Sequence, residues 1–352
     1  MAKLWAGLDI GAETTSICVI DDAGNVVRER DCATDLQCVR REIAAFKRRR
    51  SLSIGMEAGV GIHLARGLRD LGYSVDIYEA RQLSKFLRLR RNKTDAGDAN
   101  GIAQAGRLAA PMVAKVFLKS LDCQELASKL AIRRHVIRAR VAGFRVLCSQ
   151  VELFGGRLPR RIRTASFHSQ VEQQVRKLFG RRPTLLSAEL LRLQTHCELL
   201  VEWQHALDLE LKQRAEADPV CRRLMEIPGV GPICALTFTA AIGDPYRFRH
   251  AADVGSYLGL TPRLKQSGFS RKTGRISRMG HRYARNVLVQ ASLHFMRSAD
   301  PQLALHAWTS AIALRRGRGK SRVALARKLT TIMLAMWKKG EPFRPELLEA
   351  VA

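Results

Sequence analysis

Short apolar runs separated by turn residues in the first eighty positions constrain the fold more than any other feature. Three runs fit the strands of a meander, at 4–11, Thr14–Ile20 and Val26–Cys32. Asp21 and Asp22, with the Ala-Gly-Asn that follows, form a turn signal between the second and third runs. Beyond the meander the pattern alternates: helix over about 35–50, strand Leu52–Glu57, helix near 60–71, and strand Tyr73–Tyr78. The sequence therefore predicts an α/β unit at the N-terminus.

Three meandering strands followed by alternating helix and strand is the element order of a ribonuclease-H-like domain. Other α/β folds share much of this pattern, and the pattern alone leaves them open. Asp9 and Glu57 each close a predicted central strand. Ligand sites of open α/β sheets gather at such strand ends. Because a carboxylate buried alone is costly, these two acids need a counter-charge.

A second pair of acids lies in the stretch Lys93–Ala99. Asp95 and Asp98 stand at the start of an apolar-periodic segment, where Thr94 or Asp95 can cap a helix and place both acids on its first turn. The preceding stretch, 81–92, is basic and contains no acid. Two adjacent acids behind a run of cations suit a divalent metal held beside a polyanion. The alternative is an acid pair that only complements the helix dipole.

The four acids Asp9, Glu57, Asp95 and Asp98 form the candidate metal site. If they converge, two Mg²⁺ ions roughly 3.5–4 Å apart would activate a nucleophile and stabilise the leaving oxygen of a phosphoryl transfer. The competing interpretation assigns the strand-end acids to loop capping or surface ion pairs. Asp21 and Asp22 fit a turn better than a site.

Residues 120–218 are helical by period. One apolar stripe at 3-4 spacing is typical of a coiled-coil seam, and its members are Leu186, Leu190, Leu193, Cys197, Leu200, Gln204, Leu207 and Leu211. An earlier helix, from about Leu126 to Phe154, carries a matching stripe, and Gly- and Pro-containing breaks lie between the two. We expect a long helical hairpin that joins two domains or pairs subunits. An ordinary helical bundle without a partner is the alternative.

The C-terminal part opens with the turn Ile227–Pro232, followed by an apolar run to Ile242. Helix-hairpin-helix modules use such a turn, with glycines like Gly229 and Gly231, to bring backbone amides to a DNA phosphate. A Pro-Gly turn between two packed helices looks similar. Further on, 257–285 carries Gly-flanked serines among arginines. On chemistry alone these serines favour phosphate binding, since a serine nucleophile needs activation that a sequence does not display.

The charge balance points to an acidic partner. The chain of 352 residues has 60 Lys and Arg against 32 acids, a formal net charge of +28. Between Arg247 and Lys328 there are 18 cations and two acids, whereas residues 1–57 hold nine of each. Nucleic acid is the simplest partner of such an excess. No continuous apolar span accompanies the charge, which disfavours a membrane.

The cysteines and the N-terminus indicate a compartment. Eight cysteines are scattered without a C-x-x-C pair, as reduced core residues of a cytosolic protein would be, and they argue against a zinc site. The start runs straight into a strand and shows no signal peptide. We expect a cytoplasmic protein.

Taken together, these motifs resemble one known family. Asp9 in Leu-Asp-Ile-Gly, Glu57 in Met-Glu-Ala and the pair in Asn-Lys-Thr-Asp-Ala-Gly-Asp-Ala look like the DEDD tetrad of the insertion-sequence-110 transposases. Ile-Pro-Gly-Val-Gly, Tyr-Leu-Gly-Leu-Thr-Pro-Arg and Gln-Ser-Gly complete the pattern in the same order over nearly the whole chain. Relatives of that family include the Piv-type DNA invertases and the bridge-RNA-guided recombinases.

The resemblance implies a RuvC-like catalytic domain over 1–115, a coiled-coil connector over 116–218 and a C-terminal transposase domain over 219–352. It further implies that the four acids bind Mg²⁺, for which Mn²⁺ substitutes, and that Ser267 attacks DNA to give a covalent phosphoserine intermediate. Ser267 thereby becomes the leading nucleophile candidate, ahead of its neighbours Ser270 and Ser277. The implied partners are double-stranded donor and target DNA, a structured guide RNA and further copies of the chain in a dimer or tetramer.

Basic residues beside these motifs are the candidate nucleic-acid ligands, although a solvated basic face is the competing interpretation for all of them. With the two turn glycines, they are Arg88, Arg90, Arg91, Lys93, Gly229, Gly231, Arg263, Lys265, Arg271, Lys272, Arg275, Arg278 and Arg282.

Two functions other than that of a serine recombinase remain as alternatives. One is a RuvC-like invertase or endonuclease without an RNA guide, and the other is a non-catalytic nucleic-acid-binding protein whose acids are structural.

Overall fold

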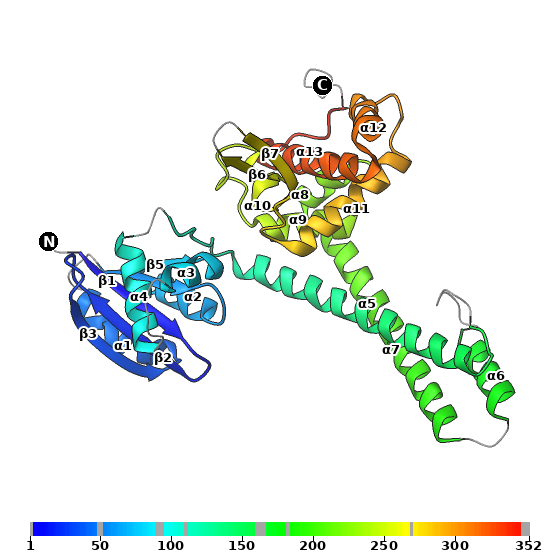
Figure 1. The fold of residues 1–352 in the computed structure, drawn as a ribbon, viewed down its shortest axis with the longest axis horizontal. Helices are drawn as coiled ribbons and strands as arrows, with labels where there is room; N and C mark the ends of the chain where they lie inside the picture. The colour runs from blue at the N-terminus through cyan, green and yellow to red at the C-terminus, as the bar shows by residue number, and fades with distance from the viewer. Residues whose placement is uncertain are drawn as a thin grey trace. The chain divides into compact units, whose positions relative to one another are not determined.

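The computed structural model describes residues 3–47, 52–88, 95–108, 112–158, 167–180, 184–267 and 270–345. The chain divides into two compact units, Met1–Leu118 and Lys119–Ala352. The first is a mixed α/β unit and the second is mostly helical (Figure 1). At this level the predicted fold class is confirmed. The finer division, with boundaries at 115 and 218, stays a prediction.

The first unit is built on a five-stranded sheet of order β3-β2-β1-β4-β5. Its strands are β1 (Leu4–Ile10), β2 (Thr14–Ile20), β3 (Val26–Ala33), β4 (Leu52–Glu57) and β5 (Ser74–Tyr78). Strands β1, β2 and β3 pair antiparallel, as a meander requires, while β1, β4 and β5 run parallel. Each strand expected from the sequence is present, and each end lies within one residue of its expected position.

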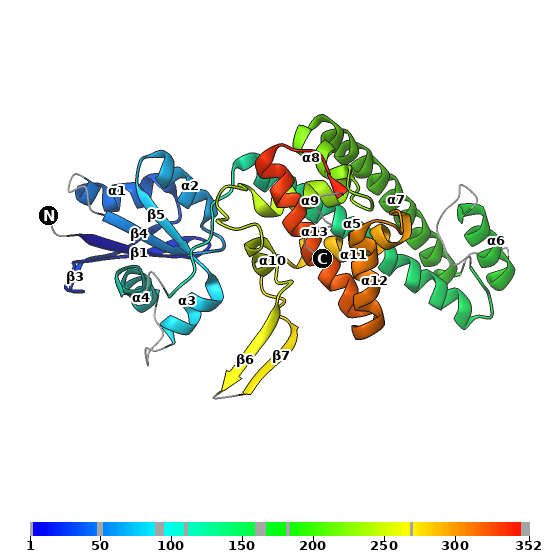
Figure 2. The ribbon, with the colours of Figure 1, turned by 90° about the horizontal axis from the view of Figure 1, so that it is seen from above.

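Helices cover both faces of this sheet. Figure 2 shows α1 (Leu36–Lys47) and α2 (Ile62–Asp70) on one face, and α3 (Ala80–Leu87) and α4 (Asp95–Leu108) on the other. Alternation along β1 decides what each face packs against. Leu4, Ala6 and Leu8 join the core beneath α1 and α2, whereas Trp5 packs with residues of α4. Odd-numbered positions of β1 therefore face α4.

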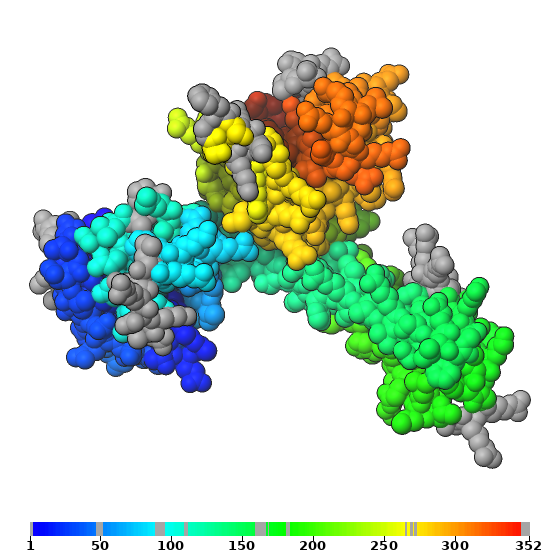
Figure 3. Space-filling model, viewed as in Figure 1, coloured from blue at the N-terminus to red at the C-terminus, as the bar shows by residue number. Residues whose placement is uncertain are grey.

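Two long helices dominate the start of the second unit. α5 (Leu121–Leu153) and α7 (Leu185–Ala217) pack side by side, and α6 (Phe167–Phe179) lies against α7. In the space-filling view this helical segment, in green, is elongated (Figure 3). Several members of the predicted stripe on α7 are buried, namely Leu190, Cys197, Leu200, Leu207 and Leu211. Whether the pair serves as a coiled-coil connector stays a prediction.

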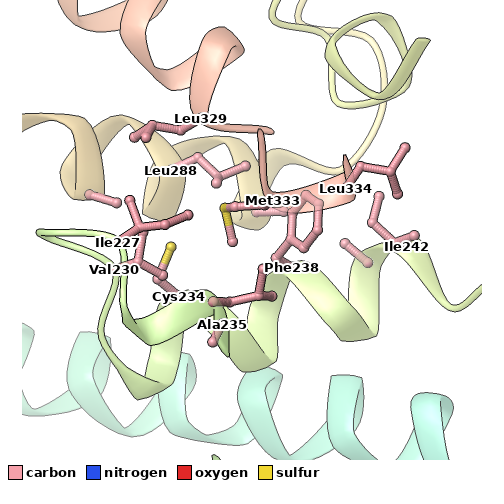
Figure 4. Packing of buried hydrophobic residues seen from close by; sticks show 14 of the residues in the cluster. Ile227, Val230, Cys234, Ala235, Phe238, Ile242, Leu288, Leu329, Met333 and Leu334 are labelled. Atoms are coloured by element: carbon pink, nitrogen blue, oxygen red, sulfur yellow. The ribbon is translucent and has the colours of Figure 1, made fainter. Parts of the chain in front are cut away.

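The rest of the second unit packs around one apolar helix. α9 (Pro232–Ile242) is buried over all of Cys234–Ile242, as expected of a helix that is hydrophobic on every side. Figure 4 shows Ile227 and Val230 of the preceding turn beside Cys234, and Met333 close to Phe238. α9 packs against α5, α7, α8 (Pro219–Met225) and α11 (Arg282–Ser298). α13 (Arg318–Lys339) packs on α11 and α8, and it carries α10 (Asp253–Tyr257) and α12 (Ala304–Arg316).

A two-stranded hairpin, which the sequence pattern does not predict, interrupts these helices. It consists of β6 (Pro262–Ser267) and β7 (Ser270–Ile276), and Figure 2 shows it extending away from the helices. Leu264 is 59% exposed on it. Among the described residues, no helix is long and apolar enough to cross a membrane.

Candidate active site and nucleic-acid interface

Asp9 and Glu57 lie at the same edge of the sheet. Leu8 of β1 pairs with Met56 of β4 in parallel register, and the two acids are the next residue on each strand. The direction of their side chains follows from alternation. Gly55 faces α4, because a Cβ added to it would lie 3.3 Å from the Cγ2 of Ile102. Side chains two residues apart on a strand lie on the same face. Glu57 therefore faces α4 like Gly55, and Asp9 faces α4 like Trp5, which lies four residues before it.

The N-terminus of α4 lies at this same edge. A Cβ added to Gly7 would lie 2.0 Å from the carbonyl oxygen of Ala99, and one added to Gly106 would lie 3.2 Å from the ring of Trp5. The helix therefore runs antiparallel to β1, with its beginning towards Asp9. Asp98 directly precedes Ala99. Three acids predicted from separate stretches thus come to one end of the sheet.

The exposure of these acids differs. Asp9 and Asp98 are partly buried and Glu57 is exposed. Asp95 is the first residue of α4, and its side chain lies outside those described. Among the described side chains, no three Asp, Glu, His or Cys residues are grouped closely enough to hold a metal ion.

Asp21, one of the acids that compete for a site role, has a structural role in the turn between β2 and β3, as predicted. Asp21 accepts a hydrogen bond from the backbone N–H of Asn25 at 2.8 Å. That bond is the main cause that lowers the pKa of the Asp21 carboxyl. The interpretation of Asp21 as a turn residue is confirmed.

Ser267 is the last residue of β6 and is exposed. It pairs directly with Ser270 of β7. Strand alternation does not predict this hairpin; the one local signal for it is Gly268, because glycine is favoured at the first of two residues that connect a pair of strands. The candidate nucleophile and its closest competitor therefore face each other across the hairpin tip.

Basic groups crowd the base of this hairpin. The pKa of His281 is lowered, first by burial and then by Lys119 and Arg134. Burial, followed by Arg278 and Arg282, lowers the pKa of Arg285. Positive groups that lower one another's pKa repel each other, so a polyanion bound beside them would be favoured.

Further candidate nucleic-acid ligands lie in the hairpin, just after it, and at the C-terminal end of α3. Arg263, Arg275 and Arg278 are exposed, as is Arg88 at the end of α3. Arg263 also donates to the carbonyl of Ser277 at 3.0 Å, which ties β6 to the residue that follows β7. The remaining candidates lie outside what the structure describes: the residues Arg90, Arg91 and Lys93, and the side chains of Lys265, Arg271 and Lys272.

The two glycines of the turn before α9 have different environments. Gly229 has φ +82°, and a Cβ there would lie 2.4 Å from the backbone nitrogen of Phe295. Close packing of the turn on α11 is therefore sufficient to explain this glycine without a ligand. Gly231 is exposed, and a Cβ there would meet nothing within 4 Å.

Comparison with known proteins gives matches over both units. A family model of DEDD transposases of IS110 elements matches residues 6–153. A second model, described as the transposase IS116/IS110/IS902 family, matches residues 221–307. A probable family 20 transposase of Pseudomonas aeruginosa is 29% identical over 96% of this chain and 98% of its own.

Other relatives extend the comparison. The transposase for insertion sequence element IS1111A of Coxiella burnetii is 26% identical over 96% of this chain and 90% of its own length. The pilin gene-inverting protein of Moraxella bovis is 30% identical over 36% of this chain and 39% of its own. The two family models match the α/β unit and much of the helical unit. These matches identify the chain as a transposase, a class of enzyme that acts on DNA. The chain belongs to the IS110 family of transposases.

Proposed function

We propose that this transposase cleaves and exchanges DNA strands through a covalent phosphoserine intermediate, with carboxylates of a RuvC-like domain binding Mg²⁺ and Ser267 as the nucleophile. The observation that carries the proposal is the register of the sheet, which brings Asp9 and Glu57 side by side beneath the start of α4. The strand order β3-β2-β1-β4-β5 supports the ribonuclease-H-like assignment.

The donor set fits a magnesium site. Asp9, Glu57, Asp95 and Asp98 offer only carboxylate oxygens, the ligands that Mg²⁺ prefers. When bound, a pair of Mg²⁺ ions would stabilise charge on the attacking and leaving oxygens of the phosphate. Mn²⁺ takes similar oxygen ligands, so it should support the reaction as well.

The covalent step balances within the chain and its substrate. The Oγ of Ser267 loses its proton and forms a bond to the phosphorus of a DNA phosphodiester, while the bond from phosphorus to one deoxyribose oxygen breaks. That oxygen leaves as a hydroxyl after taking up a proton. Attack by a deoxyribose hydroxyl from another strand then reverses the chemistry, frees Ser267 and joins the new ends. The phosphodiester count is conserved, so no external energy source is needed.

The proposed partners follow from charge and from the family. Double-stranded donor and target DNA supply the phosphodiesters, and a structured guide RNA pairs with both, so that base pairing selects the sequence while the basic protein surface binds the backbone. A formal net charge of +28 accords with binding more than one nucleic acid. Because recombination joins several strand ends, we expect the chain to act as a dimer or tetramer.

The decisive experiment detects the intermediate. Purified protein is incubated with RNA transcribed from the flanks of its element, labelled donor and target DNA, and Mg²⁺, and products are separated on a denaturing gel. We expect a protein–DNA adduct that needs Mg²⁺ and RNA. Ser267→Ala should abolish it, whereas the matched variant Ser270→Ala should retain it.

Other outcomes would identify the rival functions. Cleaved DNA without an adduct, retained by Ser267→Ala and lost by Asp9→Asn, would indicate an endonuclease that uses water. An adduct that forms equally well without RNA would remove the guide from the proposal. If Asp95→Asn left every DNA transaction unchanged, the acids would be structural and the chain a binding protein.

DNA inversion is a second candidate function, favoured by the similarity to the pilin gene-inverting protein. The same carboxylates and serine would serve it, and only the products differ. A substrate carrying two inverted recombination sites would give an inverted segment rather than an inserted one, which sequencing of the products distinguishes.

A further inference from the structure

A cavity of about 490 Å³ opens between α5, the turn before α9, and α11. Its volume lies within the range of small-molecule sites. The lining combines arginines of α5 with a tyrosine and uncharged polar residues of α11. Of the residues that the structure places around it, none is an Asp or Glu. The cavity therefore suits a ligand that carries negative charge.

The α5 wall supplies positive charge. Arg133 forms an ion pair with Asp208, so its charge is compensated. Arg134 lies over the ring of Tyr283, 5.1 Å from its centroid. Neither Arg134 nor Arg138 forms an ion pair with an acid in the described part of the chain. Arg138, which is exposed, is thus available to an anion in the cavity, while Arg134 and Tyr283 form a planar pair on its wall.

The α11 wall is a stripe of a different kind. Tyr283, Asn286, Gln290 and His294 follow one another at spacings of three or four residues, so they share one face of the helix. Asn286, Gln290 and His294 are exposed. Side-chain amides carry both donors and acceptors, as base edges require, and an aromatic ring is a platform for base stacking.

Gly231 lines the same cavity from the third side. Its backbone is extended, with φ −93° and ψ −179°, a conformation that any residue adopts. Protein packing does not require a glycine there, because an added Cβ would meet open space. Glycine does allow a ligand to approach the backbone closely.

We propose that this cavity binds one unpaired nucleotide of the nucleic-acid substrate. Its phosphate contacts Arg138, and its base lies beside the Arg134–Tyr283 pair with an edge towards Asn286 and Gln290. The bases of a duplex are paired and stacked, so none of them can enter the cavity. The site therefore takes a base from a single-stranded DNA segment or from an RNA loop. The inference rests on the proposed function, since it presupposes a nucleic-acid substrate, but it concerns binding and not cleavage.

The test measures binding by the full-length protein. Short single-stranded DNA and RNA probes carrying 5-iodouracil are titrated by fluorescence anisotropy at several salt concentrations and then photo-crosslinked. We expect a crosslink at Tyr283. Arg138→Gln should weaken binding about tenfold and lower the salt slope by about one. Asn286→Ala should weaken it about fivefold.

Arg145→Gln is the matched control, because Arg145 is an exposed arginine of the same helix that does not line the cavity. It should change affinity less than twofold. Equal losses in the two arginine variants, or crosslinks confined to other residues, would overturn the nucleotide site. A crosslink with DNA alone or RNA alone supports the site and identifies which nucleic acid occupies it.

Failure of this inference is separable from failure of the proposed function. A Tyr283 crosslink without any Ser267 adduct would leave the nucleotide site standing and remove the serine mechanism. A Ser267 adduct without a cavity crosslink would do the reverse.

Discussion

Substituting Gly7 by alanine should separate the two halves of the candidate metal site. The added Cβ would lie 2.0 Å from the carbonyl oxygen of Ala99 and 2.5 Å from the backbone nitrogen of Ala103. Both contacts are to backbone atoms of α4, so no side chain can rotate away. To restore even a 3.0 Å contact with the oxygen, α4 and β1 must separate locally by about 1 Å.

Two effects follow from this displacement. Overpacking of this kind costs about 1–3 kcal/mol of unfolding free energy. Because the acids at the start of α4 move relative to Asp9, strand cleavage should fall about 100-fold, the usual consequence of an ångström of misplacement at a reacting centre. The activity loss should persist at temperatures where the variant is fully folded.

The assay pairs urea unfolding with adduct formation at a temperature below both unfolding transitions. Gly59→Ala is the stability control, since a Cβ at Gly59 would meet nothing within 4 Å; it should change the unfolding free energy by less than about 0.5 kcal/mol. A Gly7→Ala protein that is destabilised yet fully active would refute the argument that α4 sets the acid geometry. A Gly7→Ala protein as stable and as active as the unsubstituted protein would refute the close approach of α4 to Gly7.

Three further outcomes follow from the structure. Burial and then Arg247 lower the pKa of Lys119 to about 8 from 10.5, so the unfolded chain binds more protons between these values. Stability should therefore rise from about pH 8 to 10 relative to Lys119→Met in urea unfolding. Burial raises the pKa of Cys221 and Cys234 to about 12; both thiols should resist iodoacetamide at pH 8 in the folded protein, as mass spectrometry can check. Asp9→Asn, Ser267→Ala and the double variant should show the same complete loss of adduct on a denaturing gel.

Local patterns are sufficient to predict the sheet and its acidic edge. Strand alternation and a carboxylate at a strand end are properties of a few adjacent residues, so Asp9 and Glu57 can be paired from the sequence alone. The approach of α4 to Gly7 depends on tertiary packing, and nothing in Lys93–Ala99 specifies which way that helix crosses the sheet. The sequence therefore predicts which acids are candidates for the site, but it does not predict the contact between α4 and Gly7 that positions them.

The hairpin and the cavity escape sequence-based prediction for related reasons. Because β6 and β7 are exposed on both faces, the hairpin lacks the apolar alternation by which strands are recognised. Arg134 and Arg138 lie on a long helix among many cations, where a solvated face is the ordinary expectation. Their relation to Tyr283 arises only when α5 packs beside the turn and α11, which are far apart in the sequence.

The composition of the hairpin gives a reason to expect that, in the proposed mechanism, Ser267 depends on the acids. Its hairpin, 262–276, contains no Asp, Glu or His, so no general base of the hairpin can take the hydroxyl proton. In the proposed mechanism, the four acids would supply the missing function, directly or through bound Mg²⁺. In return, the carboxylates have no nucleophile other than water unless the serine reaches them. Substituting either Ser267 or the acids alone should therefore abolish adduct formation. A second substitution should cause no further loss, so the two effects should not be additive.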